Sequence, residues 1–179
     1  MAQMPIRYLD WAATAPPYLD ILQQASRLAS EEYGNPSSQH AVGKAAKARL
    51  DEARTTLAGV IGTVPERIVF TSGGTESDSI ALLSAMLGKG QKSVIISAIE
   101  HAAVFEQARM LEELGIKVIK IAPDPHGLVH PDSVADAVRP DTAVIAVMAV
   151  NNETGAIQPV RQIDRKSTRL NSSHGQLSR

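Results

Sequence analysis

The residue types at positions 70–77, Phe-Thr-Ser-Gly-Gly-Thr-Glu-Ser, could bind an anion. They follow a short apolar run at 68–70, which predicts a strand, and precede an apolar stretch at 80–87, which predicts a helix. A helix that begins here leaves unpaired backbone N–H groups and the positive end of its dipole at one point, an arrangement that binds phosphate. The two glycines allow the backbone to approach an anion, and the hydroxyl groups of Ser72 and Thr75 can add donors. The alternative is an ordinary strand-to-helix turn in which Thr75 serves only as the N-cap.

Two further loops carry polar groups directly after predicted strands. His101 follows the run at 93–97, and an Asn-Asn-Glu-Thr-Gly segment at 151–155 follows the run at 142–147. Because ligands bind outside the carboxyl ends of the strands in an open parallel sheet, we expect these two loops and the glycine turn to meet at one edge. Each loop also has an ordinary interpretation, since asparagine and glycine are common in turns and a histidine at a helix start often only caps the helix.

His101 could act in two ways. The dipole at a helix N-terminus lowers the pKa of an imidazole and favours the neutral ring. A neutral ring can stack on a flat aromatic ligand or relay protons. The histidines at 40, 126 and 130 show no spacing typical of metal ligands, so we predict no metal site.

Composition restricts the class of protein. The chain of 179 residues is 44% apolar and 21% charged, and its net charge is −1, which favours neither nucleic acid nor an anionic membrane surface as a partner. It contains no cysteine, which excludes disulfides and thiolate metal sites within it. The N-terminus lacks the apolar core of a secretory signal, and we therefore expect a cytoplasmic protein.

The order of the predicted elements indicates an α/β fold with a largely parallel sheet that helices cover on both faces. Ser38 is the expected N-cap of the second helix. We predict strands at 68–70, 93–97, 117–121 and 142–147, and helices at 21–33, 38–61, 75–87, 101–114 and 132–138.

The last part of the chain differs from the rest in composition. Residues 166–179 lack an apolar period and are dominated by Ser, Arg and Asn. We interpret 165–179 as a non-native tail from a cloning or read-assembly junction, with a disordered natural terminus as the alternative. Residues 1–15 then form an N-terminal segment, and 16–164 form a partial domain that ends just as a helix begins near 160–163.

Five motifs, in this order and spacing, resemble the cysteine desulfurases, which are class V, fold-type I pyridoxal 5'-phosphate enzymes. Three of the motifs are the glycine turn at 70–77, Glu100-His101 and the segment 151–155; the other two are Tyr-Leu-Asp-x-Ala-Ala-Thr at 8–14 and Gly-Asn-Pro-Ser-Ser-x-His at 34–40. The Ser-Gly-Gly-Thr-Glu-Ser and Asn-Asn-Glu-x-Gly forms are similar to the branch that serves iron–sulfur cluster and nitrogenase maturation.

The resemblance implies a site and a reaction. Gly74 and Thr75 would bind the phosphate of pyridoxal 5'-phosphate, His101 would stack on its ring and assist proton transfer, and Asn152 would hydrogen-bond its phenolic oxygen. Such enzymes convert L-cysteine to L-alanine and leave sulfur as an enzyme-bound persulfide. The resemblance also implies a homodimer, sulfur-acceptor or scaffold proteins as partners, and a position near the site for the segment 35–40.

Departures from the family pattern limit what this chain can do. Trp11 stands where asparagine or tyrosine is usual, and Ser79 stands where asparagine is frequent. The family's cofactor-linking lysine, in a Ser-x-His-Lys motif, and its sulfur-accepting cysteine have no counterpart in these residues. We therefore expect an N-terminal fragment that is inactive by itself. Two alternatives stay open: another class V aminotransferase or lyase, and a non-catalytic phosphate- or nucleotide-binding module.

Overall fold

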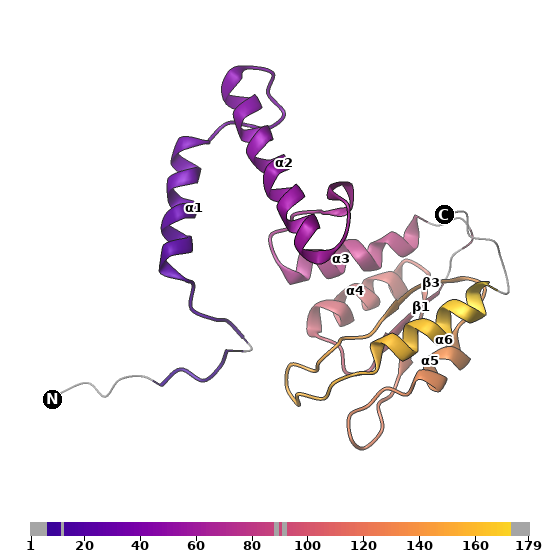
Figure 1. Cartoon of the computed structure of the whole chain (residues 1–179). Helices are drawn as coiled ribbons and strands as arrows, with labels where there is room; N and C mark the ends of the chain where they lie inside the picture. The colour runs from indigo at the N-terminus through magenta and orange to yellow at the C-terminus, as the bar shows by residue number, and fades with distance from the viewer. Residues whose placement is uncertain (1–6, 12, 88–89, 91–92, 173–179) are drawn as a thin grey trace. The chain divides into compact units, whose positions relative to one another are not determined.

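The computed structural model describes residues 7–11, 13–87, 90 and 93–172. The chain divides into two compact units, Met1–Phe70 and Thr71–Arg179. Figure 1 shows the elements of both units. This division lies far from the predicted boundary at residues 15 and 16, and the assignment of 1–15 as a separate segment stays a prediction.

The first unit is helical. It contains α1 (Leu19–Glu31), α2 (Ala41–Ile61) and a short 3-10 helix, η1 (Pro65–Arg67). The predicted N-cap Ser38 was wrong, because residues 35–38 form a turn in which Ser38 N–H donates to the carbonyl of Asn35 (2.9 Å). His40 is the N-cap of α2, and its Nδ1 accepts a hydrogen bond from the N–H of Gly43 (3.2 Å).

The predicted strand at residues 68–70 was also wrong. These residues pair with no strand in the part of the chain that the structure describes, and Val69 is 67% exposed. Arg54 occupies the place of a strand partner, because its Nε donates to the carbonyl of Ile68 (3.3 Å) and its guanidinium lies 5.4 Å from the ring centroid of Phe70. The apolar residues 68–70 are therefore extended, but they do not form a strand, because a strand also needs a neighbouring strand that pairs with its backbone groups.

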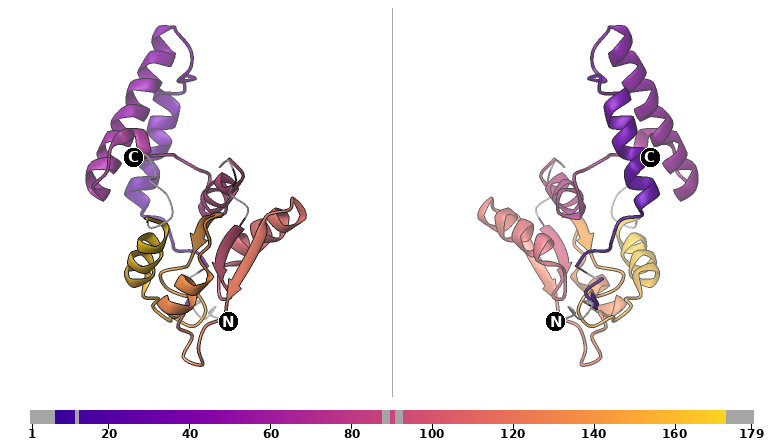
Figure 2. Two further views of the ribbon diagram at one scale, coloured as in Figure 1. Left: turned by 90° about the vertical axis from the view of Figure 1, so that its right-hand side faces the viewer. Right: turned by 90° about the vertical axis from the view of Figure 1, so that its left-hand side faces the viewer.

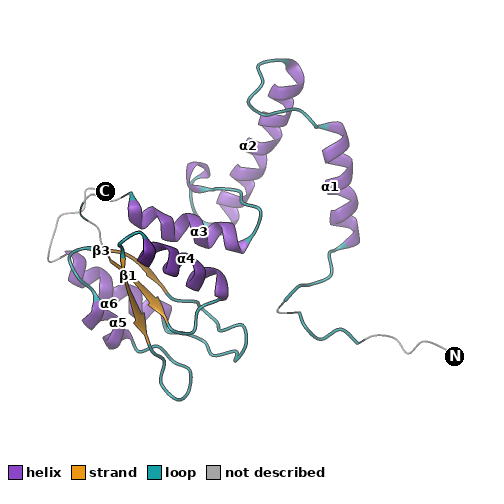
Figure 3. Cartoon of the chain, turned by 180° about the vertical axis from the view of Figure 1, so that it is seen from behind, coloured by secondary structure: helices purple, strands orange, loops and turns teal. Residues whose placement is uncertain are grey.

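The second unit contains a parallel sheet in the order β2-β1-β3. Its strands are β1 (Ser93–Ser97), β2 (Lys117–Ile121) and β3 (Thr142–Ala146). Every residue of β1 is buried, as expected for a central strand of a sheet with two covered faces. Figure 3 shows the three strands between helices, with the connecting loops at their ends.

Helices cover both faces of this sheet (Figures 1 and 2). α3 (Gly74–Leu83) and α4 (Ala102–Glu113) pack on one face; α5 (Pro131–Ala137) and α6 (Val160–Ser172) pack on the other. Because successive side chains of a strand point to opposite faces, Val94 and Ile96 join the core with α3 and α4, whereas Ile95 joins the core with α5 and α6. The α/β fold with a parallel sheet is confirmed.

Several helix ends differ by one to three residues from the sequence-based expectation, and the C-terminal ends of α3 and α6 differ most. α3 continues beyond Leu83 as a 3-10 turn, η2 (Ser84–Met86). α6 extends to Ser172, so residues 166–172, predicted to belong to an irregular tail, are helical in the structure. Residues 173–179 lie outside the described residues, and the foreign origin of the tail stays a prediction. None of the described helices combines the length and apolar character that crossing a membrane requires.

Candidate functional site

The start of α3 has the geometry of an anion-binding turn. The helix begins at Gly74, and its N-cap is Gly73, which has no side chain to satisfy the first N–H groups. The alternative in which Thr75 is the N-cap was wrong, because Thr75 is already the second residue of the helix. A Cβ atom at Gly73 or Gly74 would meet nothing within 4 Å, so the backbone at this point is open to a ligand. The unpaired donors and the helix dipole therefore face accessible space.

Side chains inside the turn hold its shape. Oε2 of Glu76 accepts hydrogen bonds from the N–H of Ser72 (2.6 Å) and from its hydroxyl (2.7 Å). The hydroxyl groups of Thr71 and Ser77 are 2.8 Å apart, and each lies 3.2 Å from the carbonyl of Gly73. The hydroxyl proton of Ser72 is thus directed to Glu76, in contrast to the expectation that it is a free donor for the anion.

The same hydrogen bonds affect the charge of Glu76. The backbone N–H of Ser72, and then its hydroxyl, lower the pKa of the Glu76 carboxyl below its usual range. The carboxylate in the first turn of α3 also interacts favourably with the helix dipole. Glu76 is therefore ionised near neutral pH, and its hydrogen bonds to Ser72 maintain the conformation of the turn.

His101 is the N-cap of α4. Its Nδ1 accepts a hydrogen bond from the N–H of Ala103 (3.1 Å), and its side chain is exposed. His101 therefore caps α4, and its further role as a ligand residue stays a prediction. An accepting Nδ1 carries no proton, so the proton of the neutral ring lies on Nε2. The cap fixes the ring by one nitrogen and leaves the other nitrogen for a ligand.

The loop after β3 contains two asparagines in different environments. Asn151 is 8% exposed, and its Oδ1 accepts from the N–H of Glu153 (3.1 Å) and from the N–H of Thr154 (2.8 Å). This is an Asx-type turn, in which the side chain shapes the backbone that follows it. Asn152 is exposed at the tip of the turn. The sequence motif thus combines a structural asparagine with an accessible one.

The polar side chains of half-buried Glu100 and buried Asn151 join the loops after β1 and β3. Oε1 of Glu100 accepts from the N–H of Met148 (2.7 Å), and Nδ2 of Asn151 donates to the carbonyl of Ile99 (2.9 Å). The structure therefore brings together the loops that carry His101 and Asn152. Sequence reasoning did not predict these roles for Glu100 and Asn151. The available signal was their position, because Glu100 directly precedes His101 and Asn151 directly precedes Asn152.

A third polar residue, the buried Gln158, holds the far end of the loop after β3. Its Oε1 accepts from the N–H of Val129 (2.9 Å), and its Nε2 donates to the carbonyl of Gly127 (2.7 Å). The loop is thus bonded to the β2–α5 connection as well as to the loop after β1. Sequence reasoning missed Gln158 also, because nothing local distinguishes it from a surface glutamine.

The α3 turn belongs to the same unit as these loops. Leu82 of α3 packs in one core with Val104 and Leu111 of α4, so the two helices that begin at Gly74 and after His101 lie against each other. The contact of Gly74, Thr75, His101 and Asn152 with one ligand stays a proposal.

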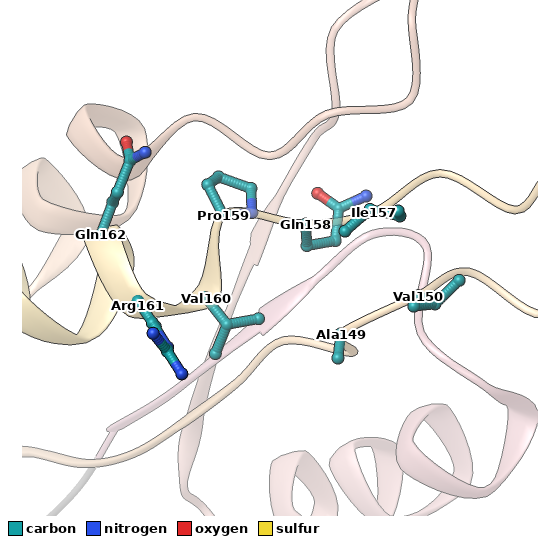
Figure 4. Close-up of a pocket in the computed structure, with 8 residues that line it drawn as sticks. All are labelled: Ala149, Val150, Ile157, Gln158, Pro159, Val160, Arg161 and Gln162. Carbon is teal, nitrogen blue, oxygen red and sulfur yellow. The ribbon is translucent and has the colours of Figure 1, made fainter.

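A hollow of about 360 Å³ lies beside the loop after β3 (Figure 4). It is open and mainly apolar, and its lining residues are Ala149, Val150, Ile157, Gln158, Pro159, Val160, Arg161 and Gln162. None of the candidate ligand residues lines it. The shape of the hollow therefore does not identify the predicted site, which depends on the helix starts and loop tips instead.

The parallel sheet and its two helical layers define an α/β domain, and the uncapped start of α3 gives this domain the geometry of an anion-binding turn. A sequence profile for "Aminotransferase class-V" matches residues 7–171. The chain belongs to the class V aminotransferase family.

Known relatives agree with the resemblance to cysteine desulfurases. The chain is 39% identical over 161 residues to "Cysteine desulfurase IscS" of Dictyoglomus turgidum, which is 88% of this chain and 41% of that protein. A solved "NIFS-LIKE PROTEIN" matches with a TM-score of 0.82 and 34% identity over 90% of this chain and 45% of its own. The structure titled "SspA in complex with cysteine" matches with a TM-score of 0.83 and 32% identity, over 92% of this chain and 48% of its own. The chain spans about two fifths of the length of the curated relatives it matches.

Proposed function

We propose that this chain is the N-terminal part of a pyridoxal 5'-phosphate-dependent cysteine desulfurase, which converts L-cysteine to L-alanine and passes the sulfur to a cysteine thiol as a persulfide. The uncapped start of α3 at Gly74 is the observation that carries the proposal. It gives an anion-binding point in a chain whose relatives include cysteine desulfurases. The persulfide-forming cysteine lies outside these 179 residues, since they contain none.

The residues present fit the cofactor. The N–H groups of Gly74 and Thr75 would bind its phosphate, because no side chain of the described residues pairs with them and both residues are exposed. His101, whose Nδ1 is held by the N–H of Ala103, would stack on its ring. The side-chain amide of Asn152 would donate to its phenolic oxygen. When bound, the cofactor supplies an electron sink for the substrate, while the protein orients it.

Further properties follow from the family and are part of the proposal. They are a cytoplasmic location, a homodimer, iron–sulfur cluster assembly as the use of the sulfur, and acceptor or scaffold proteins as partners. Another class V aminotransferase or lyase would use the same cofactor contacts. The residues that distinguish these activities are not among those that bind the phosphate.

Binding of pyridoxamine 5'-phosphate to the 179-residue chain tests the proposal. This probe retains the phosphate, the ring and the phenolic oxygen, and it has no aldehyde that could react with surface lysines. Its fluorescence should saturate on titration, and AMP or inorganic phosphate should compete weakly. Tighter binding of the nucleotide would overturn the proposal and support a nucleotide-binding module.

Two substitutions at one position test the backbone donor directly. Gly74→Pro removes an N–H at the first helical position, where proline is well tolerated and where the extended Gly73 before it suits proline. Gly74→Ala keeps the N–H and adds a methyl group in open space. We expect the proline variant to bind the probe about tenfold more weakly or worse, because a hydrogen bond to a charged group is lost. Equal affinity of the two variants would exclude phosphate binding by this N–H.

A further inference from the structure

We propose that Glu100 is a positioning residue, whose carboxylate locks the loop after β1 to the loop after β3 and so fixes His101 relative to Asn152. The ligand role of those two residues rests on the proposed function. The lock itself does not, because it consists of contacts within the chain.

The first part of the lock is the carboxylate of Glu100, which accepts one hydrogen bond from the end of β1 and one from just beyond the end of β3. Oε1 of Glu100 accepts from the hydroxyl of Ser97 (2.5 Å), the last residue of β1, and from the N–H of Met148 (2.7 Å), just beyond β3. Ser97 is fully buried and Glu100 is half-buried. Hydrogen bonds to an ionised acceptor in a partly buried setting are stronger than those between neutral groups.

The position of Met148 explains why a side chain is needed here. β3 ends at Ala146 and β1 ends at Ser97, so the N–H of Met148 lies beyond the ladder of the sheet. The Glu100 carboxylate supplies the acceptor that the neighbouring strand no longer offers. It thereby extends the connection between the two strands past the end of the sheet.

The second part of the lock runs in the opposite direction. Nδ2 of Asn151 donates to the carbonyl of Ile99 (2.9 Å), while Oδ1 of Asn151 accepts from the Thr154 N–H (2.8 Å) and its hydroxyl (3.0 Å). One side chain thus joins the two loops and also sets the turn whose tip is Asn152. Together with Glu100, it cross-links the loops at two points.

The two dipeptides divide their roles in the same way. In Glu100-His101 the first residue makes the buried link and the second is exposed with one ring nitrogen free; in Asn151-Asn152 the first is buried and the second is exposed. Each candidate ligand residue is therefore covalently next to an anchor of the lock. A shift of one anchor moves the ligand residue beside it.

Amide hydrogen exchange of the 179-residue chain measures the lock without any ligand. Glu100→Ala should raise the exchange rate of the Met148 N–H about tenfold or more, because a charge-assisted hydrogen bond is lost. Glu100→Gln, whose amide oxygen can still accept, should restore most of the protection. Glu113→Ala, which removes an exposed carboxylate at the end of α4, is the matched control and should leave the rate unchanged.

Pyridoxamine 5'-phosphate then tests whether the lock positions the ligand residues. Its circular dichroism on binding reports how the ring is held, and we expect it to fall in Glu100→Ala and to recover in Glu100→Gln. If Glu100→Ala does not fold, Glu100→Asp replaces it, since the carboxylate is kept but no longer reaches Met148.

The outcomes separate the two proposals. Unchanged exchange at Met148 in Glu100→Ala or Glu100→Asp would overturn the lock. Changed exchange with unchanged affinity and dichroism of the probe would overturn the positioning role. Failure of the wild-type chain to bind the probe would count against the proposed function, while the exchange at Met148 would still decide the lock.

Discussion

Replacement of Gln158 by leucine tests how firmly the loop after β3 is held. Gln158 is 5% exposed and bonds to two backbone groups 29 and 31 residues away, the N–H of Val129 (2.9 Å) and the carbonyl of Gly127 (2.7 Å). Leucine has a similar volume but can neither donate nor accept. The substitution therefore removes both bonds, and a longer one from Nε2 to the carbonyl of Ala156 (3.4 Å), with little change in packing.

The expected cost follows from the burial of the two partners. Val129 is fully buried, and a buried N–H left without an acceptor costs about 1–3 kcal/mol. Gly127 is half-buried, so its carbonyl loses about 0.5–1.5 kcal/mol. The sum is about 1.5–4.5 kcal/mol of unfolding free energy. The exposed Gln162→Leu, four residues along, should change it by about 0.5 kcal/mol or less.

Urea unfolding followed by circular dichroism gives the global value, and amide exchange at Val129 gives the local one. We expect Gln158→Leu to unfold at lower urea concentration than Gln162→Leu and its Val129 N–H to exchange at least about tenfold faster. Equal midpoints for the two variants, together with an unchanged Val129 rate, would refute the reasoning from buried hydrogen bonds.

Three further predictions concern single positions. Gly43→Ala should destabilise α2 in thermal unfolding, because the new Cβ would lie 2.5 Å from the carbonyl oxygen of Ser38. Gly59→Ala in the same helix adds a Cβ that meets nothing within 4 Å, so it should stabilise the chain by about 1 kcal/mol. Hydrogen bonds from Ser72 lower the pKa of Glu76, so they contribute their full stabilisation at pH values above the usual carboxyl pKa near 4.5. This stabilisation is lost as the pH falls through the lowered pKa and the carboxylate becomes protonated. Protection of the Ser72 N–H should therefore decrease with acid in the wild-type chain, and a Glu76→Gln variant that loses protection over the same pH range would contradict this. Leu111→Ala, at a fully buried position of α4, should cost about 2–5 kcal/mol in urea unfolding, and a cost below 1 kcal/mol would mean that this core is not packed as described.

Local patterns predicted the elements of the second unit well. The strands at 93–97 and 117–121 have the bounds expected from their Val- and Ile-rich runs. β1 carries apolar residues on both faces because it is fully buried, whereas β2 keeps Lys117 and Lys120 exposed. A helix start within the glycine turn was also predicted, with an uncapped start and a Thr75 cap as the two alternatives, of which the structure has the uncapped start. These features depend on residues that are close in sequence.

The errors involved partners that are distant in sequence or unusual in type. Residues 68–70 have the composition of a strand, but Arg54 takes the carbonyl that a neighbouring strand would bond. His40 caps α2 in place of Ser38, because an imidazole Nδ1 can accept from an N–H although histidine is a rare cap. Glu100 and Gln158 bond to groups 48 and 29 residues away, which no local pattern encodes.

The candidate ligand residues could be named from the sequence because of their motifs, not because of periodicity. α3 begins at Gly74, one residue before the predicted start, and His101 is the N-cap of α4, one residue before the helix begins. Asn152 lies at an exposed turn tip. The division between Asn151 and Asn152 could not be predicted, since two identical side chains in succession carry no signal for which one is buried. Burial is decided by the acceptor that Ile99 offers to Asn151.

The most direct test of the account is an NMR titration of the isotope-labelled chain with pyridoxamine 5'-phosphate. We predict that the backbone N–H signals of Gly74 and Thr75, the ring signals of His101 and the side-chain amide of Asn152 shift together along one saturation curve, with contacts from the probe's ring to His101. Shifts of Gly74 and Thr75 alone, with the signals of His101 and Asn152 unmoved at saturation, would contradict the claim that these groups bind one coenzyme.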